Sequence, residues 1–208
     1  MIGRCFSASI KVGAGLRSGE GIGCWRRKKN APQNCTLWVT VLFLCLFSFK
    51  ILGQEPAQEY QIKAAFLFNF AKFVEWPPDA FPNADSPIII GVLGKNVFGH
   101  YLEDTIRGKT VQNRPFLLKE FKSVDEAVHC HILFIDPSVS ESLSGIIKDL
   151  HNTSVLTVSE TDQFLKAGGM VNFIIEDNKV HFQINDEAAK AAGLKVSSKL
   201  LSLAAHNH

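Results

Sequence analysis

Cysteine is scarce in this chain and unevenly placed. Of the five cysteines in 208 residues, four lie within the first 45 positions, and Cys130 is the only one beyond them. Without that first segment, the remainder can form no internal disulfide and must be held by its hydrophobic core. Its roughly 155 residues are enough for one domain to do so. A buried thiol is the first interpretation of Cys130, and an intermolecular disulfide is the alternative.

Positive charge is also scarce beyond the N-terminal segment. The chain has 22 Lys and Arg and 20 Asp and Glu, but residues 1–53 hold eight of the basic residues and one of the acidic ones. Residues 54–208 therefore carry 14 basic and 19 acidic side chains, a formal net charge of −5. Such a domain has no excess of cations to follow a phosphate backbone, which excludes nucleic-acid binding.

Motifs of catalysis and cofactor binding are missing. The turn Gly91–Asn96 follows a strand pattern but lacks the spacing of either glycine-rich phosphate loop. His129 and His131 are two residues apart, yet no third ligand stands at a metal-binding spacing. There is no serine-nucleophile elbow. We expect a protein without enzyme activity, cofactor or metal; a hydrolase is a weaker alternative that would need a nucleophile in a deep cleft.

Long hydrophobic runs are confined to one place. Residues 37–49 form an uncharged apolar run of thirteen, preceded by the basic cluster Arg26–Lys29. A basic segment before an apolar run of this length is typical of a secretory signal peptide. We expect residues 1–53 to be a leader, cleaved near Gly53-Gln54, and residues 54–208 to be the exported domain. A transmembrane anchor is the alternative, although the run is short for a bilayer.

The most aromatic segment follows the expected leader. Residues 60–77, YQIKAAFLFNFAKFVEWP, contain four phenylalanines, a tyrosine and a tryptophan. Polar residues interrupt the segment every few positions: Lys63, Asn69, Lys72 and Glu75. The pattern therefore predicts a water-soluble helix that is apolar around most of its circumference and buried on several sides.

The middle of the chain alternates between strand and helix patterns. Strands are expected at 88–93, 110–121, 132–135 and 154–158. Helical segments are expected around Phe98–Leu102, over Ser123–Val128, from Ser138 to Leu150 with Glu141 as the capping-box partner of Ser138, and from Thr161 to Gly168-Gly169. This alternation predicts an α/β fold with a largely parallel sheet.

The end of the chain departs from that alternation. Val171–Ile175 and Lys179–Ile184 flank the turn residues Glu176–Asn178, which predicts an antiparallel hairpin. A helix capped by Asp186 and a last amphipathic helix over 197–205 should follow. We therefore expect a single-domain three-layer sandwich, with a mostly parallel sheet and a C-terminal antiparallel hairpin.

Four segments in order resemble one family: KAAFLFNFAKFVEWP, CHILFI, VLTVSETDQFLKAGGMVNFIIEDNKVHFQIN and AAKAAGLKVSSKLLSLA. Together, over about Tyr60 to Ala205, they resemble YfiR/HmsC-type periplasmic proteins. The resemblance implies an exported domain in the periplasm of a Gram-negative bacterium, often a homodimer and not an enzyme. It further implies a repressor that binds the periplasmic sensor domain of an inner-membrane diguanylate cyclase, lowering cyclic di-GMP and biofilm formation. Redox control through intramolecular disulfides does not carry over, because Cys130 has no partner here.

Candidate partner-binding residues lie near the C-terminal hairpin. They are Phe164, Phe173, Glu176 and Phe182. Each phenylalanine could instead belong to the core, and the two on the hairpin could pack on each other. A periplasmic small-molecule binding module is the alternative function. It would use Gly94–Asn96 and Asp136–Ser138, because open parallel sheets bind ligands at their carboxyl ends.

Overall fold

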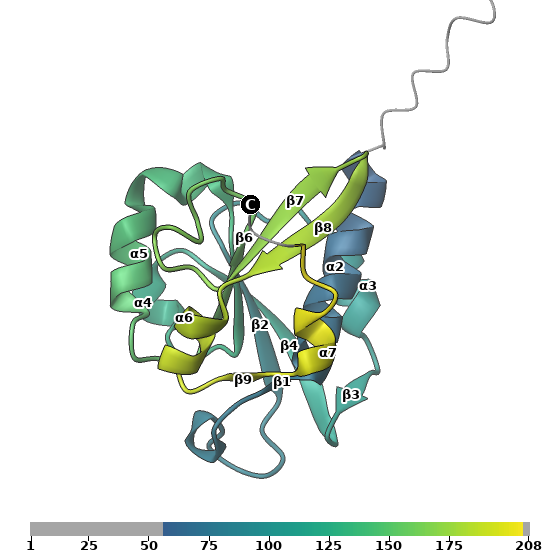
Figure 1. The fold of residues 1–208 in the computed structure, drawn as a ribbon. Coiled ribbons are helices and arrows are strands. Elements are labelled where there is room, and N and C mark those ends of the chain that lie inside the picture. Colours follow the sequence, from purple (N-terminus) through teal and green to yellow (C-terminus); the bar gives the residue numbers. More distant parts are fainter. Residues whose placement is uncertain (1–55, 206–208) are drawn as a thin grey trace, which may run out of the picture. The chain divides into compact units, whose positions relative to one another are not determined.

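A seven-stranded sheet runs through residues 56–205, the part of the chain that the computed structural model describes (Figure 1). Its strand order is β3 (Thr110–Val111), β4 (Arg114–Phe121), β2 (Ile88–Leu93), β5 (Ile132–Ile135), β6 (Leu156–Ser159), β7 (Val171–Glu176) and β8 (Lys179–Ile184). The five strands from β4 to β7 are parallel, and β3 and β8 add antiparallel edges. The expected leader 1–53 and the tail 206–208 lie outside the described residues.

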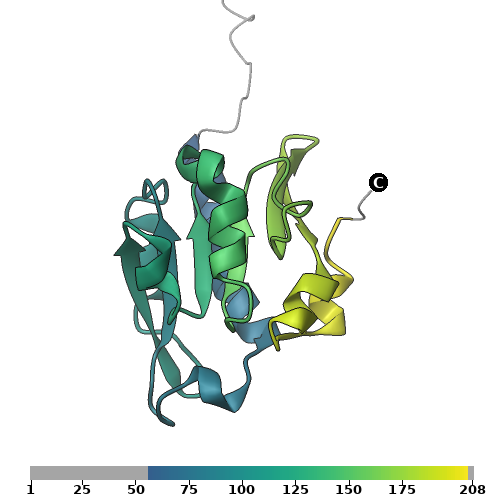
Figure 2. The same ribbon diagram turned by 90° about the vertical axis from the view of Figure 1, so that its left-hand side faces the viewer.

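Helices cover both faces of the sheet (Figure 2). They are α2 (Pro56–Phe73), α3 (Tyr101–Ile106), α4 (Val124–Ala127), α5 (Leu143–Asp149), α6 (Asp186–Ala191) and α7 (Ser198–Leu201), with short 3-10 turns η1 (Pro78–Ala80) and η2 (Pro137–Ser142). Helices α2 and α3 pack in the larger core on one face, and α4 and α5 pack in a second core on the other. The three-layer α/β prediction is confirmed. Among the described helices, none is long and apolar enough to cross a membrane.

The aromatic segment forms most of α2, and the sheet curls around it (Figure 1). Leu67 and Phe70 are fully buried against the sheet. The flank of the helix is covered as well, because Phe68 packs on Phe116 of β4 with ring centroids 5.4 Å apart. After α2, the strand β1 (Val74–Glu75) pairs antiparallel with β9 (Lys195–Val196) and joins the start of the domain to its end. The predicted burial on several sides is confirmed.

The predicted C-terminal hairpin is present as β7 and β8. Asp177 and Asn178 both have positive φ, at 49° and 59°, as a two-residue hairpin turn of the primed type requires. A second hairpin was missed, because residues 110–121 form β3 and β4 rather than one strand. Its turn residues Gln112 and Asn113 also have positive φ, at 50° and 64°.

The structure differs from the prediction at two helices, those expected from Ser138 to Leu150 and from Thr161 to Gly169. Asp136 accepts a hydrogen bond from the Ser138 amide at 3.0 Å, and the chain continues from Pro137 in 3-10 turns, so α5 begins only at Leu143. The side chain of Glu141, the proposed capping partner, lies outside the described part. Residues 162–168 form successive turns instead of a helix. Phe164 in this segment is fully buried, and its ring lies so close to Gly169 that a β-carbon there would be 2.4 Å from it.

The two C-terminal helices are capped by residues next to or at the predicted positions. Asn185, not Asp186, caps α6 by accepting a hydrogen bond from the Ala188 amide at 3.1 Å. Ser197 caps α7 by accepting from the Leu200 amide at 3.2 Å. The helix itself ends at Leu201, and turns follow to Ala205, so the last predicted helix is shorter than expected.

Candidate functional site

A groove of about 530 Å³ lies where β6 and β7 end, beside the first turns of α2. We call it the carboxyl-edge groove; its lining residues are Glu59, Tyr60, Lys63, Glu160, Asp162, Phe173, Ile174, Ile175, Glu176 and Gln183. It combines apolar side chains of β7 with four carboxylates and one ammonium group. The site therefore presents a negative formal charge.

Lys63 organises the polar side of this groove. Its side chain is 2% exposed and forms ion pairs with Glu59, one turn earlier on α2, and with Glu160, directly after β6. The Tyr60 hydroxyl donates a hydrogen bond to Glu160 at 3.0 Å. Burial, together with the neighbouring Glu160 carboxylate, raises the pKa of the Tyr60 phenol well above its ordinary range. These contacts fasten α2 to the loop after β6.

The loops after β2 and β5 approach each other closely at the same edge. Gly94 has φ of +95°, and a β-carbon there would lie 3.2 Å from Asp136 Cβ and from Ser138 Oγ. Asp136 is buried, and its carboxylate accepts the Ser138 amide. The two loops that were considered for a small ligand are therefore packed on each other.

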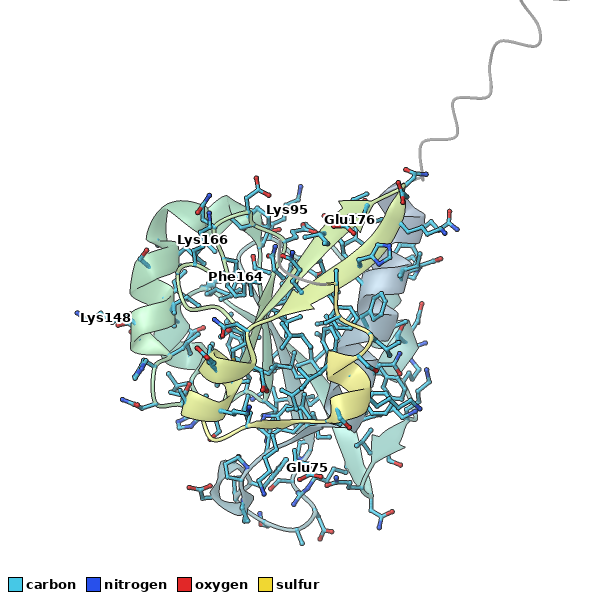
Figure 3. The ribbon with its side chains drawn as sticks, in the orientation of Figure 1. Glu75, Lys95, Lys148, Phe164, Lys166 and Glu176 are labelled. Carbon is cyan, nitrogen blue, oxygen red and sulfur yellow. The ribbon has the colours of Figure 1, made fainter. Side chains whose placement is uncertain are left out.

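Of the four predicted partner-binding residues, the three phenylalanines are buried and Glu176 is exposed. Phe164 is fully buried in the core beneath α5, and Phe173 and Phe182 are each 2% exposed. Phe182 packs edge-on against Phe70 of α2, with ring centroids 5.2 Å apart. Glu176 is exposed at the end of the hairpin (Figure 3). The phenylalanines thus shape the surface from beneath, and only Glu176 of the four presents its side chain to solvent.

Sequence reasoning missed Ile175, which is 49% exposed beside Glu176 and lines the carboxyl-edge groove. An isoleucine at the end of a strand, next to a hairpin turn, is the one sequence feature that could have indicated an exposed apolar residue. The sequence pattern does not show which apolar residues of a strand are covered by a helix. The burial of Lys63 was missed as well, because a lysine in an otherwise apolar helix is expected on the side of the helix that faces solvent.

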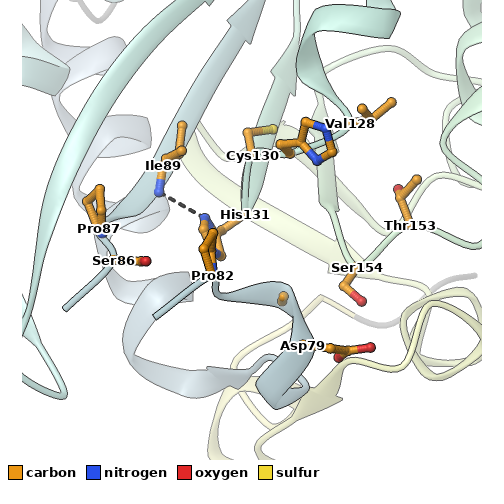
Figure 4. Close-up of a pocket in the computed structure, with 12 residues that line it drawn as sticks. Asp79, Pro82, Ser86, Pro87, Ile89, Val128, Cys130, His131, Thr153 and Ser154 are labelled. Carbon is orange, nitrogen blue, oxygen red and sulfur yellow. Dashed lines mark hydrogen bonds between the residues drawn. The ribbon is translucent and has the colours of Figure 1, made fainter. Parts of the chain in front are cut away.

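A second hollow, of about 570 Å³, lies at the opposite end of the parallel strands (Figure 4). We call it the amino-edge cleft. It opens between the loop after α2 and the starts of β2, β5 and β6, and is lined by Asp79, Ala80, Pro82, Ser86, Pro87, Ile89, Val128, His129, Cys130, His131, Thr153 and Ser154.

His131 is the most buried polar side chain of this cleft, at 2% exposed. Its Nδ1 accepts a hydrogen bond from the Ile89 amide at 3.0 Å (Figure 4), and its Nε2 has no hydrogen-bond partner. Burial lowers the pKa of His131 to about 4, and the positive charge of Arg114 acts in the same direction. The Ala80 backbone opposes this shift, although it makes no hydrogen bond of normal geometry to Nε2.

Aromatic side chains hold the His131 ring in place. Phe81 stacks on it with ring centroids 4.4 Å apart, and the Trp76 indole donates to the His131 carbonyl at 3.1 Å. Arg114 lies 3.8 Å from the Phe81 ring centroid and donates to the carbonyls of Asn83 and Ser86, at 2.9 Å each. The loop after α2 is thereby fixed over the start of β5.

The sequence and the fold were compared with known protein families and solved structures. The profile of the YfiR/HmsC-like family matches residues 60–205. The chain belongs to the YfiR/HmsC-like family. No curated protein matches it in sequence. A conserved domain protein from Vibrio cholerae, solved by crystallography, is similar with a TM-score of 0.47 and 10% identity; the match covers 68% of this chain and 58% of the other, so this chain spans little more than half of that protein.

In this YfiR/HmsC-like domain the single cysteine is a buried thiol, as expected. Burial raises the pKa of Cys130 to about 12, so the group stays protonated and is a poor nucleophile. His129 is exposed whereas His131 is buried, and β5 begins only after both. No group of three or more potential metal ligands occurs within residues 56–205.

Proposed function

We propose that this chain is an exported, non-enzymatic regulator that binds the periplasmic sensor domain of an inner-membrane diguanylate cyclase and represses it. Membership of the YfiR/HmsC-like family is the observation that carries the proposal. Residues 1–53 act as the leader that directs residues 54–208 to the periplasm. Binding stabilises the inactive conformation of the cyclase by population shift, which lowers cyclic di-GMP and biofilm formation. The regulator acts as a homodimer.

The carboxyl-edge groove and the adjacent hairpin end are the proposed partner surface. Ile175 supplies exposed apolar area, and Glu176 supplies a charge beside it. The groove as a whole is acidic, so the matching surface of the sensor domain is basic and apolar. Phe173 and Phe182 support this surface from the core, and Phe164 supports the neighbouring turns.

Deletion of the gene tests the proposal directly. Cyclic di-GMP, measured by mass spectrometry of cell extracts, should rise in the deletion strain and return to its original level when the wild-type gene is restored. An unchanged level in the deletion strain contradicts repression.

Charge reversal then tests the surface. The Glu176→Lys variant should fail to lower cyclic di-GMP although it accumulates normally in the periplasm. Glu75 provides a matched control, because it is an exposed glutamate at the opposite end of the sheet (Figure 3). Glu75→Lys should repress like the wild type; equal repression by both variants argues against the carboxyl-edge groove as the interface.

A further inference from the structure

Three exposed lysines converge on the outer flank of α2, where α3 and α7 lie alongside it (Figure 1). The ammonium group of Lys109, just after α3, lies 4.6 Å from the ring centroid of Phe68, and that of Lys72 lies 5.7 Å from the same centroid. The ammonium group of Lys199 on α7 lies 5.3 Å from the ring centroid of Phe73, and that of Lys72 lies 6.0 Å from it. We call these five residues the lysine patch.

The charges of the lysine patch are close together and have no partner of opposite sign. Because Lys72 and Lys109 share one ring, their ammonium groups lie within about 10 Å of each other, roughly the Debye length at 0.1 M salt. Among the described side chains, no carboxylate forms an ion pair with any of the three lysines. Glu75, the acidic residue nearest to Lys72 along the chain, lies opposite Lys195 in the β1–β9 pair. An anionic partner would therefore relieve the repulsion among the three ammonium groups.

Apolar side chains accompany these charges. The rings of Phe68 and Phe73 are half-buried, and Leu203 is 60% exposed. The Leu203 amide donates to the Leu200 carbonyl at 3.1 Å, so the turn of α7 continues to Leu203. Leu203 follows Lys199 by four residues, which places the two side chains on the same side of this turn. Lysines beside exposed Phe and Leu side chains are typical of protein surfaces that lie on an anionic bilayer.

Charge is separated along α2, although residues 54–208 are acidic as a whole. Glu59 in its first turn belongs to the carboxyl-edge groove, and Lys72 in its last turn belongs to the lysine patch. The two positions are about 20 Å apart along the helix axis, which exceeds the Debye length at physiological salt. An anionic surface that touches the patch is therefore largely screened from the acidic groove.

We propose that the lysine patch, together with Leu203, docks on an anionic phospholipid surface. The three ammonium groups contact lipid phosphates, and Leu203 enters the boundary between the headgroups and the acyl chains. The carboxyl-edge groove stays away from the lipid charge and remains open to the proposed protein partner. The docking itself requires no cyclase.

Cosedimentation with lipid vesicles tests this docking. The protein, purified after expression of the full chain, is mixed with vesicles of phosphatidylcholine alone, or of phosphatidylcholine and phosphatidylglycerol in equal amounts. Binding to the anionic vesicles should be at least about tenfold tighter than binding to the neutral ones. It should weaken as salt is raised to 1 M, because the Debye length falls to about 3 Å.

Removing the three charges together should have the largest effect. The triple variant Lys72→Gln, Lys109→Gln, Lys199→Gln should bind anionic vesicles about a hundredfold more weakly, since each lysine near an anionic surface contributes about fivefold.

A second triple variant is the matched control, because it loses the same net charge from exposed lysines that lie away from α7 and the last turn of α2 (Figure 3). It carries Lys95→Gln, Lys148→Gln and Lys166→Gln. Its affinity for the anionic vesicles should change by less than about threefold, because these charges are more than a Debye length from the docked surface.

The substitution Leu203→Glu leaves every lysine in place and should weaken vesicle binding at least about tenfold, because it removes the inserted side chain and adds a negative charge. Soluble polyglutamate distinguishes a lipid surface from an acidic protein. It lacks an apolar layer, so it should bind the wild-type protein more weakly than the anionic vesicles do.

Four results overturn the proposal: equal binding to neutral and anionic vesicles, equal binding by the two triple variants, unchanged binding in Leu203→Glu, or tighter binding to polyglutamate than to the vesicles. The last result assigns the patch to an acidic protein instead. If the patch variant does not fold, Leu203→Glu decides the matter alone. Cyclic di-GMP is not measured here, so failure of the docking is distinguishable from failure of the proposed repression.

Discussion

Lys63 and His131 are both 2% exposed, at opposite ends of the same parallel sheet, and their surroundings differ. At the carboxyl edge, Lys63 has ion pairs with both Glu59 and Glu160. At the amino edge, His131 has one satisfied nitrogen and one without a partner. Lys63 completes its polar contacts within the chain, whereas His131 keeps one sealed ring nitrogen that makes no hydrogen bond of normal geometry.

Both ends of the parallel strands carry a hollow, of about 530 Å³ at the carboxyl edge and about 570 Å³ at the amino edge. Ligands commonly bind where the strands end, in the crevice between diverging loops. Here the loops after β2 and β5 are closed on each other around Gly94. The open part of the carboxyl edge is therefore the groove beside β6, β7 and α2.

Removing the charge of Lys63 should have the largest effect on folding. Lys63→Met leaves Glu59 and Glu160 without their partner, and breaking a buried ion pair in this way costs about 3–5 kcal/mol. Urea denaturation followed by circular dichroism measures the free energy of unfolding. Lys72→Met is the control, because Lys72 is exposed on the same helix and should change stability by less than about 0.5 kcal/mol. Equal losses in both variants would show that Lys63 is not the key contact.

Acidification should destabilise the amino edge through His131. The ordinary pKa of histidine is 6.5, and the folded value is about 4, so between these values the unfolded chain binds a proton that the folded chain does not. Stability should therefore fall as the pH falls from 6.5 to 4, by up to about 3 kcal/mol. Urea unfolding at several pH values measures the slope. In His131→Asn this component should vanish; an identical slope in the variant contradicts the assignment.

Loosening the loop over the cleft should have an intermediate effect. Arg114→Ala removes the stacking on Phe81 and two hydrogen bonds to loop carbonyls, which together should cost about 1–2 kcal/mol. Hydrogen exchange of the amides in residues 77–87 should accelerate. Arg107 is the control, because it is exposed and forms ion pairs only on the surface of α3. Exchange in the loop should be unchanged in Arg107→Ala.

Ile175→Ser should have the smallest effect on folding, within about 1 kcal/mol, because the side chain is 49% exposed. Its effect on the proposed partner should be larger, with binding to the purified sensor domain weakened at least about tenfold, as for an apolar interface residue. Leu117, 41% exposed on β4, is the matched control. If Leu117→Ser weakens binding as much as Ile175→Ser does, the interface includes the other edge of the sheet.

Much of the fold was predictable because it rests on local patterns. The run 88–93 is β2 at its predicted bounds, and the turn residues before Lys179 predicted the hairpin. The β3–β4 hairpin was missed because Gln112-Asn113 lacks the glycine that usually marks such a turn. The turns around Phe164 were missed because they depend on where that ring is buried.

The candidate sites were less predictable, since burial is a property of the assembled layers. The sequence alone allowed Phe173 and Phe182 to be either surface or core residues. They are core residues because Phe70 of α2 packs on both. Lys63 and Glu160 are 97 residues apart, and nothing near either position indicates the other.

The sequence by itself determined the scarcity of cysteine, the net negative charge of residues 54–208, the α/β order and the resemblance to the YfiR/HmsC-like family. These follow from composition and short-range periodicity, which are local. Only the tertiary structure decided that Lys63 is paired with two glutamates, that His131 is buried with one ring nitrogen hydrogen-bonded, and that the two ends of the sheet present different surfaces. Those outcomes depend on which distant side chains meet, and no local pattern contains that information.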